Sequence, residues 1–510
     1  MYTFSVHQPL SKHGRPRRFH PNPRRPVLRR LAPPPSVVSP VGRRDRSLHF
    51  KSYLPRLGLA IAPLPSRELR KLGTQRARIS APKACFTGLL RLLLRQTLSA
   101  FPLFLPSVGS VIQFFDSMRI FVLGAGATGS LLAQLLERQG HDVWCGDRDP
   151  DRAHRFLGTR STIAVAKVNA RNLHGIVRVA RGCHLIVNAS ASVFNEIVLR
   201  SALRLRAHYL DLSSHLTRNP FQPEQFRYAK KFQAKRRAAV INTGAAPGLT
   251  NLLVKRAADI IDEVHAVHIR LYESTESADP ISQWSPEVSF DEAISNPRVY
   301  LHKKYVLAKR FSELEKFRFP EPIGVVNVVL AAQDEVATLP RFIPMQELDV
   351  KIGGNEFDRL RRWHKQGKLS KSRGLQRRRF PETSSPRKIA SLIRQGILQN
   401  ARFAASVLVR GVNHEPKQDE YLVLRSDALF PTLYQIRQQG LFTTAVAYGT
   451  AHVAAQFIKY FPRDLAGVFA PEQLPPEVRR AILSGVRKHG IKLTHKITPL
   501  KPPEDDEEIL

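Results

Sequence analysis

Residues 118–148 read MRIFVLGAGATGSLLAQLLERQGHDVWCGDR, and this stretch decides the fold of the chain. It begins with a short apolar run, residues 120–123, which is typical of a buried parallel strand. The next residues place four leucines on one face of a predicted helix: Leu131, Leu132, Leu135 and Leu136. Gly140 ends this helix, and a second apolar run closes with Asp147. The order of strand, glycine turn, helix and strand predicts a dinucleotide-binding unit.

The glycine turn has the pattern GxGxxG, and its three glycines have different roles. Gly124 permits the tight turn, Gly126 lets the backbone approach a pyrophosphate, and Gly129 lets the helix lie close to the strand. The pattern alone is weak evidence, but here the strand, the helix and an acid about twenty residues further on all agree. The alternative is a chance glycine turn in another kind of α/β protein. We predict that six consecutive residues bind the cofactor: Gly124, Ala125, Gly126, Ala127, Thr128 and Gly129.

Two charged residues follow the second strand, where the adenosine ribose binds in such units. Asp147 is expected to bind ribose hydroxyls, the alternative being an ordinary turn residue. Arg148 would attract the 2′-phosphate of NADP, which Asp147 would repel, or it is a surface charge. We therefore expect either NADP or NAD to bind.

The pattern of short strands and helices continues after this unit. Further strands are predicted at residues 162–168, 184–187, 208–212 and 238–241. Alternating strands and helices predict an α/β fold with a Rossmann doubly wound parallel sheet, which binds ligands at the carboxyl ends of its strands.

The pattern changes after residue 251. Strand candidates at residues 264–272, 325–330 and 348–352 indicate a second, mixed α/β domain. We expect five segments along the chain: a leader (1–117), the Rossmann domain (118–250), the second domain (251–430), a helical segment that ends in a short strand (431–500) and an acidic tail (501–510).

The net charge of +38 arises from 80 Lys and Arg against 42 Asp and Glu in 510 residues, and it is unevenly distributed. Residues 1–117 hold 21 Lys and Arg against three acids, a net charge of +18 that leaves +20 for the remainder. This proline-rich leader cannot form a packed core. It is an organelle-targeting leader, a basic arm for an anionic surface, or translated upstream sequence with Met118 as the natural start. We favour the last, because targeting leaders are usually shorter.

Other features exclude several classes of protein. The three cysteines form no CxxC pair and have no metal-ligand spacing, so we predict no metal site and a reducing, cytoplasmic environment. The uncharged run at residues 96–115 is interrupted by prolines, so no membrane span is predicted. The basic run at residues 359–388 is a solvated surface or an anion contact. It lacks interleaved aromatic residues, so we predict no nucleic-acid site.

Several further motifs lie at the predicted strand ends. They are VNAS at residues 187–190, YLDLSS at 209–214, TGAAPGLTN at 243–251, and GVFAPEQL at 467–474 with HGIKL at 489–493. Together with GAGATG, they make the chain resemble the saccharopine dehydrogenase family over roughly residues 118–500. The APGLTN stretch is much more specific than GxGxxG alone.

The resemblance implies a Rossmann domain, a mixed-sheet domain that carries homodimer contacts, and a C-terminal segment that packs back on the first domain. It implies Asn188, Ala189 and Ser190 beside the nicotinamide ribose, and Gly244 and Ala245 along the cofactor and substrate cleft. It also implies hydride exchange between NAD(P) and a carbon–nitrogen bond.

One departure from the family concerns the substrate. Saccharopine-forming members carry an acid before the Pro-Gly pair, and this chain has Ala246 there. We therefore predict an imine or secondary amine substrate other than saccharopine.

The catalytic group is not clear from the sequence. Asp211 and Ser213 are weak candidates, and for Asp211 we favour a role as the cap of the next helix. A proton donor from the second domain is expected instead. The alternative function is a non-catalytic Rossmann protein with a sensing or assembly role.

Overall fold

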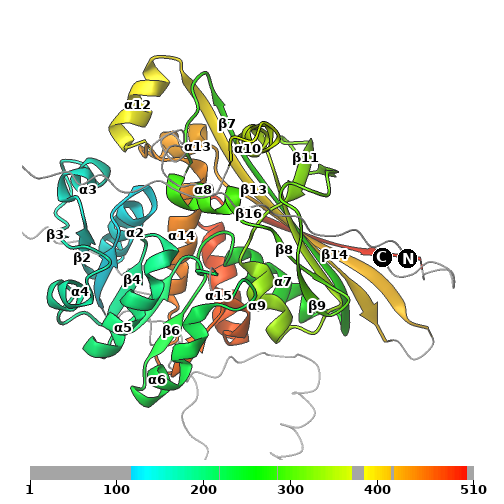
Figure 1. The fold of residues 1–510 in the computed structure, drawn as a ribbon, viewed down its shortest axis with the longest axis horizontal. Helices are drawn as coiled ribbons and strands as arrows, with labels where there is room; N and C mark the ends of the chain where they lie inside the picture. The colour runs from blue at the N-terminus through cyan, green and yellow to red at the C-terminus, as the bar shows by residue number, and fades with distance from the viewer. Residues whose placement is uncertain (1–116, 217–218, 284, 370–383, 415–417, 502–510) are drawn as a thin grey trace, which may run out of the picture. The chain divides into compact units, whose positions relative to one another are not determined.

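The computed structural model describes residues 117–216, 219–283, 285–369, 384–414 and 418–501 (Figure 1). The predicted leader, the run at residues 96–115, the centre of the basic run and nearly all of the acidic tail lie outside the described residues. Within the described ranges, no helix combines the length and the apolar character that crossing a membrane requires.

Seven parallel strands form the first sheet, in the order β15-β6-β5-β4-β1-β2-β3 (Figure 1). These strands are β1 (Arg119–Leu123), β2 (Asp142–Asp147), β3 (Val165–Lys167), β4 (Leu185–Asn188), β5 (His208–Asp211), β6 (Ala238–Val240) and β15 (Gly467–Phe469). The predicted Rossmann sheet is therefore confirmed. The strand order reverses between β1 and β4, where Leu123 pairs with Asn188. Doubly wound sheets bind ligands at this point, outside the carboxyl ends of the strands.

Helices cover both faces of the sheet. One face packs against α2 (Ala127–Arg138), α3 (Pro150–Leu157), α7 (Leu249–Ala258) and α14 (Ala445–Lys459), and the other against α4 (Leu173–Val179), α5 (Asn195–Leu205) and α6 (Ala229–Ala234). Within β1, Ile120 and Val122 belong to the first core, whereas Phe121 and Leu123 belong to the second. Because both faces are covered, β1 is a continuous apolar run rather than an alternating one.

A second sheet contains nine strands, with the path β10-β11-β12-β7-β13-β14-β16 and with β8 paired to β12 and β9. The strands are β7 (Glu263–Ser277), β8 (Arg298–Leu301), β9 (Lys304–Leu307), β10 (Glu315–Arg318), β11 (Val325–Leu330), β12 (Glu347–Gly353), β13 (Leu398–Asn413), β14 (Glu420–Leu429) and β16 (Lys492–Pro499). Among the described residues of this sheet, β12 and β7 form the one parallel pair, and the other pairs are antiparallel. This is the predicted mixed α/β part of the chain.

Six further helices accompany the second sheet and the C-terminal segment. They are α8 (Pro286–Ile294), α9 (Glu335–Phe342), α10 (Asn355–Lys365), α12 (Pro386–Arg394), α13 (Leu433–Gln438) and α15 (Pro476–Arg487).

The C-terminal segment contributes to both sheets. Its helix α14 packs against α2, and its strand β15 extends the first sheet beside β6. Its last strand, β16, pairs with β14 in the second sheet. The sequence did not indicate β15, because three residues are too short for a periodic pattern. The segment boundaries given above remain predictions.

Candidate functional site

The first and third glycines of the turn are required by the fold itself. Gly124 has φ +95°, and a Cβ there would lie 2.7 Å from the backbone nitrogen of Ser190. A Cβ on Gly129 would lie 1.9 Å from the carbonyl oxygen of Gly124. Side chains at these positions would therefore collide with backbone, so β1, α2 and the loop after β4 can approach one another only with glycine.

Gly126 is different, because space is left beside it. It precedes α2 with φ −81°, and no side chain caps the helix at this point. A Cβ on Gly126 would meet only Arg152 Nη1, at 3.9 Å. The neighbouring Ala127 and Thr128 are partly exposed. An uncapped helix N-terminus with open space in front of it fits a pyrophosphate, which would occupy the room that a side chain would fill.

Asp147 ties the end of β2 to the glycine turn. The backbone nitrogen of Ala125 donates to Asp147 Oδ2 at 2.9 Å, and that of Asp149 donates to Oδ1 at 3.0 Å. The side chain is 9% exposed. The structure therefore brings Asp147 to the turn as the sequence led us to expect, and its contact with a ribose remains a prediction.

Two arginines accompany Asp147. Arg148 is exposed, whereas Arg152 lies in α3 with its guanidinium 4.9 Å from the Phe156 ring centroid and close to Gly126. Arg152 was missed in the sequence, because nothing in the local pattern shows that α3 directs this side chain back to the turn.

Asn188 organises the loop after β4. Its Nδ2 donates to Asn195 Oδ1 at 2.7 Å, and its Oδ1 accepts from the backbone nitrogen and hydroxyl of Ser190. The backbone nitrogen of Ala189 donates to the carbonyl oxygen of Leu123 at 2.9 Å. Ala189 and Ser190 thus lie directly against the glycine turn, and both are partly exposed.

Asn195, the first residue of α5, links this loop to the next one. Its Oδ1 accepts from the Tyr209 hydroxyl at 3.3 Å, and its Nδ2 donates to the Ser213 carbonyl at 2.8 Å. It is 1% exposed and was missed in the sequence, because no motif distinguishes it from other residues at a helix start. Asn195 therefore holds the loops after β4 and β5 together.

The interpretation of Asp211 as a helix cap is wrong. Its carboxylate accepts from the Tyr209 hydroxyl at 2.9 Å, Gln225 Nε2 at 3.0 Å and the backbone nitrogen of Asn242 at 2.9 Å. Burial raises its pKa to about 7, although these hydrogen bonds oppose the rise. At 1% exposure, Asp211 lies behind the loops and anchors β6, whereas Ser213 is partly exposed at their surface.

The loop after β6 folds tightly against the C-terminal helix. A Cβ on Gly244 would lie 3.2 Å from the Leu212 carbonyl oxygen and 3.4 Å from Thr450 Cγ2 of α14. Ala245 is 2% exposed, whereas Ala246 is partly exposed. The predicted residues Gly244 and Ala245 therefore form the buried side of this loop, and Ala246 forms its outer side.

We call the predicted cofactor residues at these strand ends the cofactor edge. It comprises Gly124, Ala125, Gly126, Ala127, Thr128, Gly129, Asp147, Arg148, Asn188, Ala189, Ser190, Gly244 and Ala245.

The second domain adds carboxyl groups near the ends of β5 and β6. The backbone nitrogen of Ser214 donates to Asp334 Oδ2 at 2.9 Å, across 120 residues of sequence. The hydroxyl of Thr250 donates to Glu335 Oε1 at 2.7 Å. Gln333 Nε2 donates to Glu292 Oε1 at 2.9 Å. We call Glu292, Asp334 and Glu335, with the neighbouring Arg298, the acid cluster.

Burial raises the pKa values of the carboxyl groups in the acid cluster. Burial raises the pKa of Asp334 to about 6, although part of the side chain reaches solvent, while Arg298 and the Ser214 amide lower it. Burial also raises the pKa of Glu335 to about 7. For Glu292, burial and then the charges of Glu273 and Asp334 raise the pKa well above its ordinary value. Carboxyl groups in this range can donate protons near neutral pH.

Residues 120–240 match the family model described as the saccharopine dehydrogenase NADP binding domain. The apo saccharopine dehydrogenase (L-Glu forming) of Saccharomyces cerevisiae is similar in structure, with a TM-score of 0.55 and 11% identity. The match covers 75% of this chain and all of that one. At this identity the likeness shows the fold.

Two other solved structures are more distant. A probable dehydrogenase from Thermotoga maritima has 11% identity and a TM-score of 0.34, covering 73% of this chain and 96% of that one. The NAD complex of GenD2 from gentamicin A biosynthesis has 11% identity and a TM-score of 0.33, covering 76% and 98%.

The family match and the glycine turn agree on the cofactor, which is NAD(P), and they support an NAD(P)-dependent oxidoreductase as the class of activity. Residues 120–240 thus match a saccharopine dehydrogenase NADP binding domain, and the chain is similar in fold to a saccharopine dehydrogenase.

Proposed function

We propose that this protein exchanges a hydride between NAD(P) and the carbon–nitrogen bond of an imine or secondary amine. The observation that carries the proposal is the hydrogen bond from the Ser214 amide to Asp334. This hydrogen bond supports a position for the Asp334 carboxyl group near the strand ends that carry the cofactor edge. Bound NAD(P) would supply or accept the hydride.

The acid cluster would supply the proton that this chemistry needs. An imine accepts a hydride more readily when its nitrogen is protonated, so a proton donor must reach the nitrogen. Asp334 is partly exposed, and its pKa of about 6 suits such a donor. The neighbouring Glu292 has its pKa raised well above its ordinary value, first by burial and then by the charges of Glu273 and Asp334. Asp211 lacks comparable access, since it is 1% exposed.

The substrate is proposed to differ from saccharopine. Ala246 is the partly exposed residue of the loop after β6, and it presents a methyl group where saccharopine-forming members carry an acid. A substrate ammonium would lack that carboxylate partner here. The carboxyl groups of the acid cluster lie on other elements and would recognise a differently shaped amine.

The test is turnover of a panel of amines, imines and ketones with NADP(H) and NAD(H), followed by the absorbance of the reduced nicotinamide. The panel includes saccharopine, and glutamate with its semialdehyde for the reverse direction. We expect turnover of at least one amine or imine and none of saccharopine. Efficient saccharopine turnover would overturn the substrate assignment. Cofactor binding without any turnover would favour the non-catalytic sensing or assembly role.

We also propose that the protein is a cytoplasmic homodimer. The family resemblance supports the dimer, with contacts through the second sheet. The thiols of Cys145 and Cys183 are free and buried, which fits a reducing compartment. Sedimentation equilibrium at micromolar concentration tests the dimer, and a monomer mass there would contradict it.

A further inference from the structure

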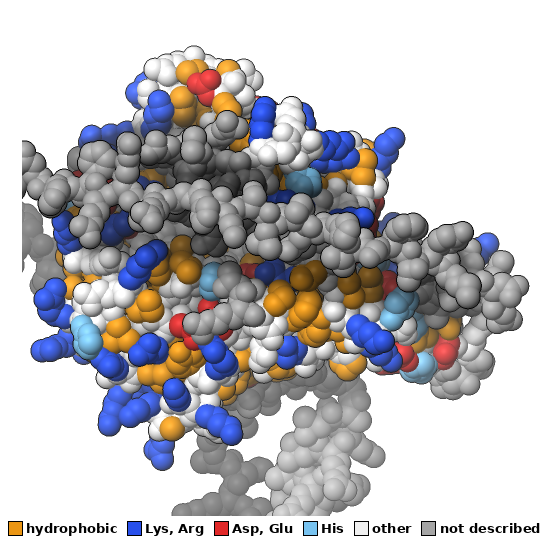
Figure 2. All heavy atoms as spheres, in the orientation of Figure 1, with side chains coloured by type: hydrophobic (Ala, Val, Ile, Leu, Met, Phe, Trp, Pro, Cys, Tyr) orange, Lys and Arg blue, Asp and Glu red, His pale blue; other side chains and the backbone are white. Residues whose placement is uncertain are grey.

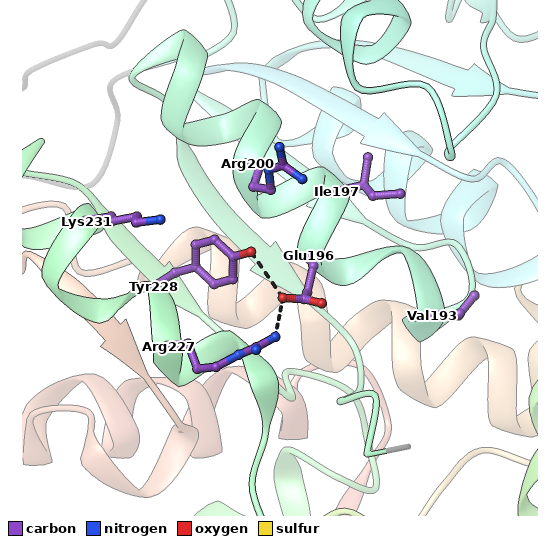
Figure 3. Close-up of a pocket in the computed structure, with 7 residues that line it drawn as sticks. All are labelled: Val193, Glu196, Ile197, Arg200, Arg227, Tyr228 and Lys231. Atoms are coloured by element: carbon purple, nitrogen blue, oxygen red, sulfur yellow. Dashed lines mark hydrogen bonds and ion pairs between the residues drawn. The ribbon is translucent and has the colours of Figure 1, made fainter. Parts of the chain in front are cut away.

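A hollow of about 560 Å³ lies on the first domain and shares no residue with the cofactor edge (Figure 3). One wall is α5, and the other is formed by the 3-10 helix η2 (Glu224–Tyr228) with α6. Three basic side chains line it, namely Arg200, Arg227 and Lys231. The proposed oxidoreductase function does not use this hollow.

The charge of Arg227 is already compensated. Arg227 forms a short ion pair with Glu196 across the hollow and lies 3.8 Å from Glu224 (Figure 3). Glu196 also accepts from the Tyr228 hydroxyl at 3.1 Å. Glu196 and Glu224 both therefore lie close to Arg227.

Arg200 and Lys231 remain as cations without such a partner. Among the residues that the structure describes, neither forms an ion pair with a carboxylate. Lys231 Nζ lies 5.3 Å from the ring centroid of Tyr228, and the ring is a further part of the lining. The hollow thus offers two uncompensated positive charges beside an aromatic ring.

The surrounding surface strengthens this positive field. Eight basic residues of α5, η2, α6 and their ends are exposed: Arg200, Arg204, Arg206, Arg227, Lys230, Lys231, Lys235 and Arg236. The only acids in residues 195–206 and 224–237 are Glu196 and Glu224, and neither is exposed. Figure 2 shows Lys and Arg side chains over the lower left of the visible face, where α5 and α6 lie in Figure 1. A hollow inside such a surface concentrates anions.

We propose that this hollow binds a small organic anion with an apolar or aromatic part. Arg200 and Lys231 would bind the acidic group, and Val193, Ile197 and the Tyr228 ring would contact the apolar part. A volume of about 560 Å³ lies within the range of about 300–1,000 Å³ that small-molecule sites occupy, whereas an extended nucleic acid would need a groove.

Calorimetric titration with phenyl phosphate tests the proposal directly. Inorganic phosphate tests the contribution of the charge alone, and benzyl alcohol tests the apolar part alone. The titrations use the Gly126→Val protein, so that the helix α2 N-terminus does not bind the probe. We expect saturable binding at one site per chain, tightest for phenyl phosphate, weaker for phosphate and absent for benzyl alcohol.

Three variants and one matched control locate the binding site. We expect Arg200→Ala and Lys231→Ala each to lower the affinity for phenyl phosphate by about threefold, which is the size of effect that exposed charge pairs have. Lys230→Ala is the matched control, because Lys230 is exposed on α6 but does not line the hollow, and it should change nothing. Glu196→Gln should tighten binding, since it frees the charge of Arg227 while keeping an amide in place of the carboxylate.

Three results would each overturn the proposal. They are no saturable binding of phenyl phosphate, equal loss in Lys230→Ala and Lys231→Ala, or weaker binding in Glu196→Gln. Tight, salt-dependent binding of an oligonucleotide without phenyl phosphate binding would also overturn it and would indicate a nucleic-acid surface instead.

Discussion

The cofactor edge and the acid cluster meet at the loop that follows β5, but they are assembled over very different distances in the sequence. In the cofactor edge, Asp147 receives its hydrogen bond from Ala125, only 22 residues away. In the acid cluster, Asp334 is held by Ser214 across 120 residues, and Glu335 by Thr250 across 85. Within the cofactor edge, the glycine turn and Asp147 form a local motif, whereas the acid cluster forms only when residues far apart in the sequence pack together.

The two regions also differ in how much space surrounds their residues. Gly126 has free space in front of it, which only a ligand would fill. In the acid cluster, burial raises the pKa values of Asp334 and Glu335, although Asp334 is partly exposed. Under the proposed function, the glycine turn would bind the cofactor and the acid cluster would transfer the proton.

The largest effect is expected from Gly126→Val. A branched side chain would occupy the place of the pyrophosphate, so cofactor affinity should fall more than about a hundredfold, or about 2.7 kcal/mol. The fold should tolerate the change, because the φ of −81° suits any residue and the nearest atom to a Cβ is 3.9 Å away. Fluorescence titration with NADPH and a melting curve measure the two properties. An unchanged affinity for NADPH would refute the assignment of the pyrophosphate site to Gly126.

Gly129→Ala should show the opposite behaviour. Its Cβ would lie 1.9 Å from the Gly124 carbonyl oxygen, so α2 and the turn must separate. We expect a loss of about 3 kcal/mol in the free energy of unfolding, at the upper end for overpacking. Denaturant unfolding measures it, with Gly126→Val as the control for a larger side chain in the same turn. Equal stability of the two variants would contradict the distinction between fold glycines and the ligand glycine.

Glu335→Gln probes the electrostatic cost of the acid cluster. The folded pKa of Glu335 is raised from 4.5 to about 7, so the folded state binds the proton more tightly than the unfolded state. Stability is therefore lost as the pH rises from about 4.5 to about 7, and it stays low above that range. The glutamine side chain of this variant cannot ionise, so its free energy of unfolding should depend less on pH across this range. Urea unfolding at several pH values measures it.

The control for this prediction is Glu477→Gln, since Glu477 is exposed at the start of α15. It should leave the pH dependence of unfolding unchanged. If Glu335→Gln shows the same pH dependence as the original protein, the buried carboxyl group is not the source of it.

The smallest effect is expected in the choice between the two cofactors. Asp147 repels a 2′-phosphate and Arg148 attracts it, so their influences oppose each other. We expect the dissociation constants for NADP and NAD to differ by less than about a hundredfold, with a lean toward NADP from the family. Titration of both cofactors under the same ionic strength decides this. A larger preference for either form would show that one charge dominates.

The sequence predicted those features that depend on neighbouring residues. The glycine turn, the strands before it and after it, and the loop at Asn188 all follow from local patterns, because the same residues that form them also contact one another. Asn195 and Asp334 were missed because their partners become neighbours only in the folded chain.

The errors in the sequence interpretation have the same cause, because they also depend on partners that are distant in the sequence. Asp211 follows a strand and precedes a loop, which favours a helix cap on local grounds. Of its actual partners, Tyr209 lies in β5 itself, but Gln225 in η2 and Asn242 after β6 become neighbours only in the folded chain. Strand β15 was missed for a related reason, since its three residues become a strand only by pairing with β6.

The most direct test of the central claim is Asp334→Asn, assayed for cofactor affinity and turnover on the amine or imine that the panel identifies. We predict unchanged NADPH affinity and a fall in kcat of about 10² to 10⁴, the usual contribution of a general acid. In the original protein, kcat/KM for imine reduction should fall as the pH rises through about 6, and this fall should vanish in the variant. Undiminished turnover in Asp334→Asn, with the same pH profile, would contradict the assignment of proton transfer to the acid cluster.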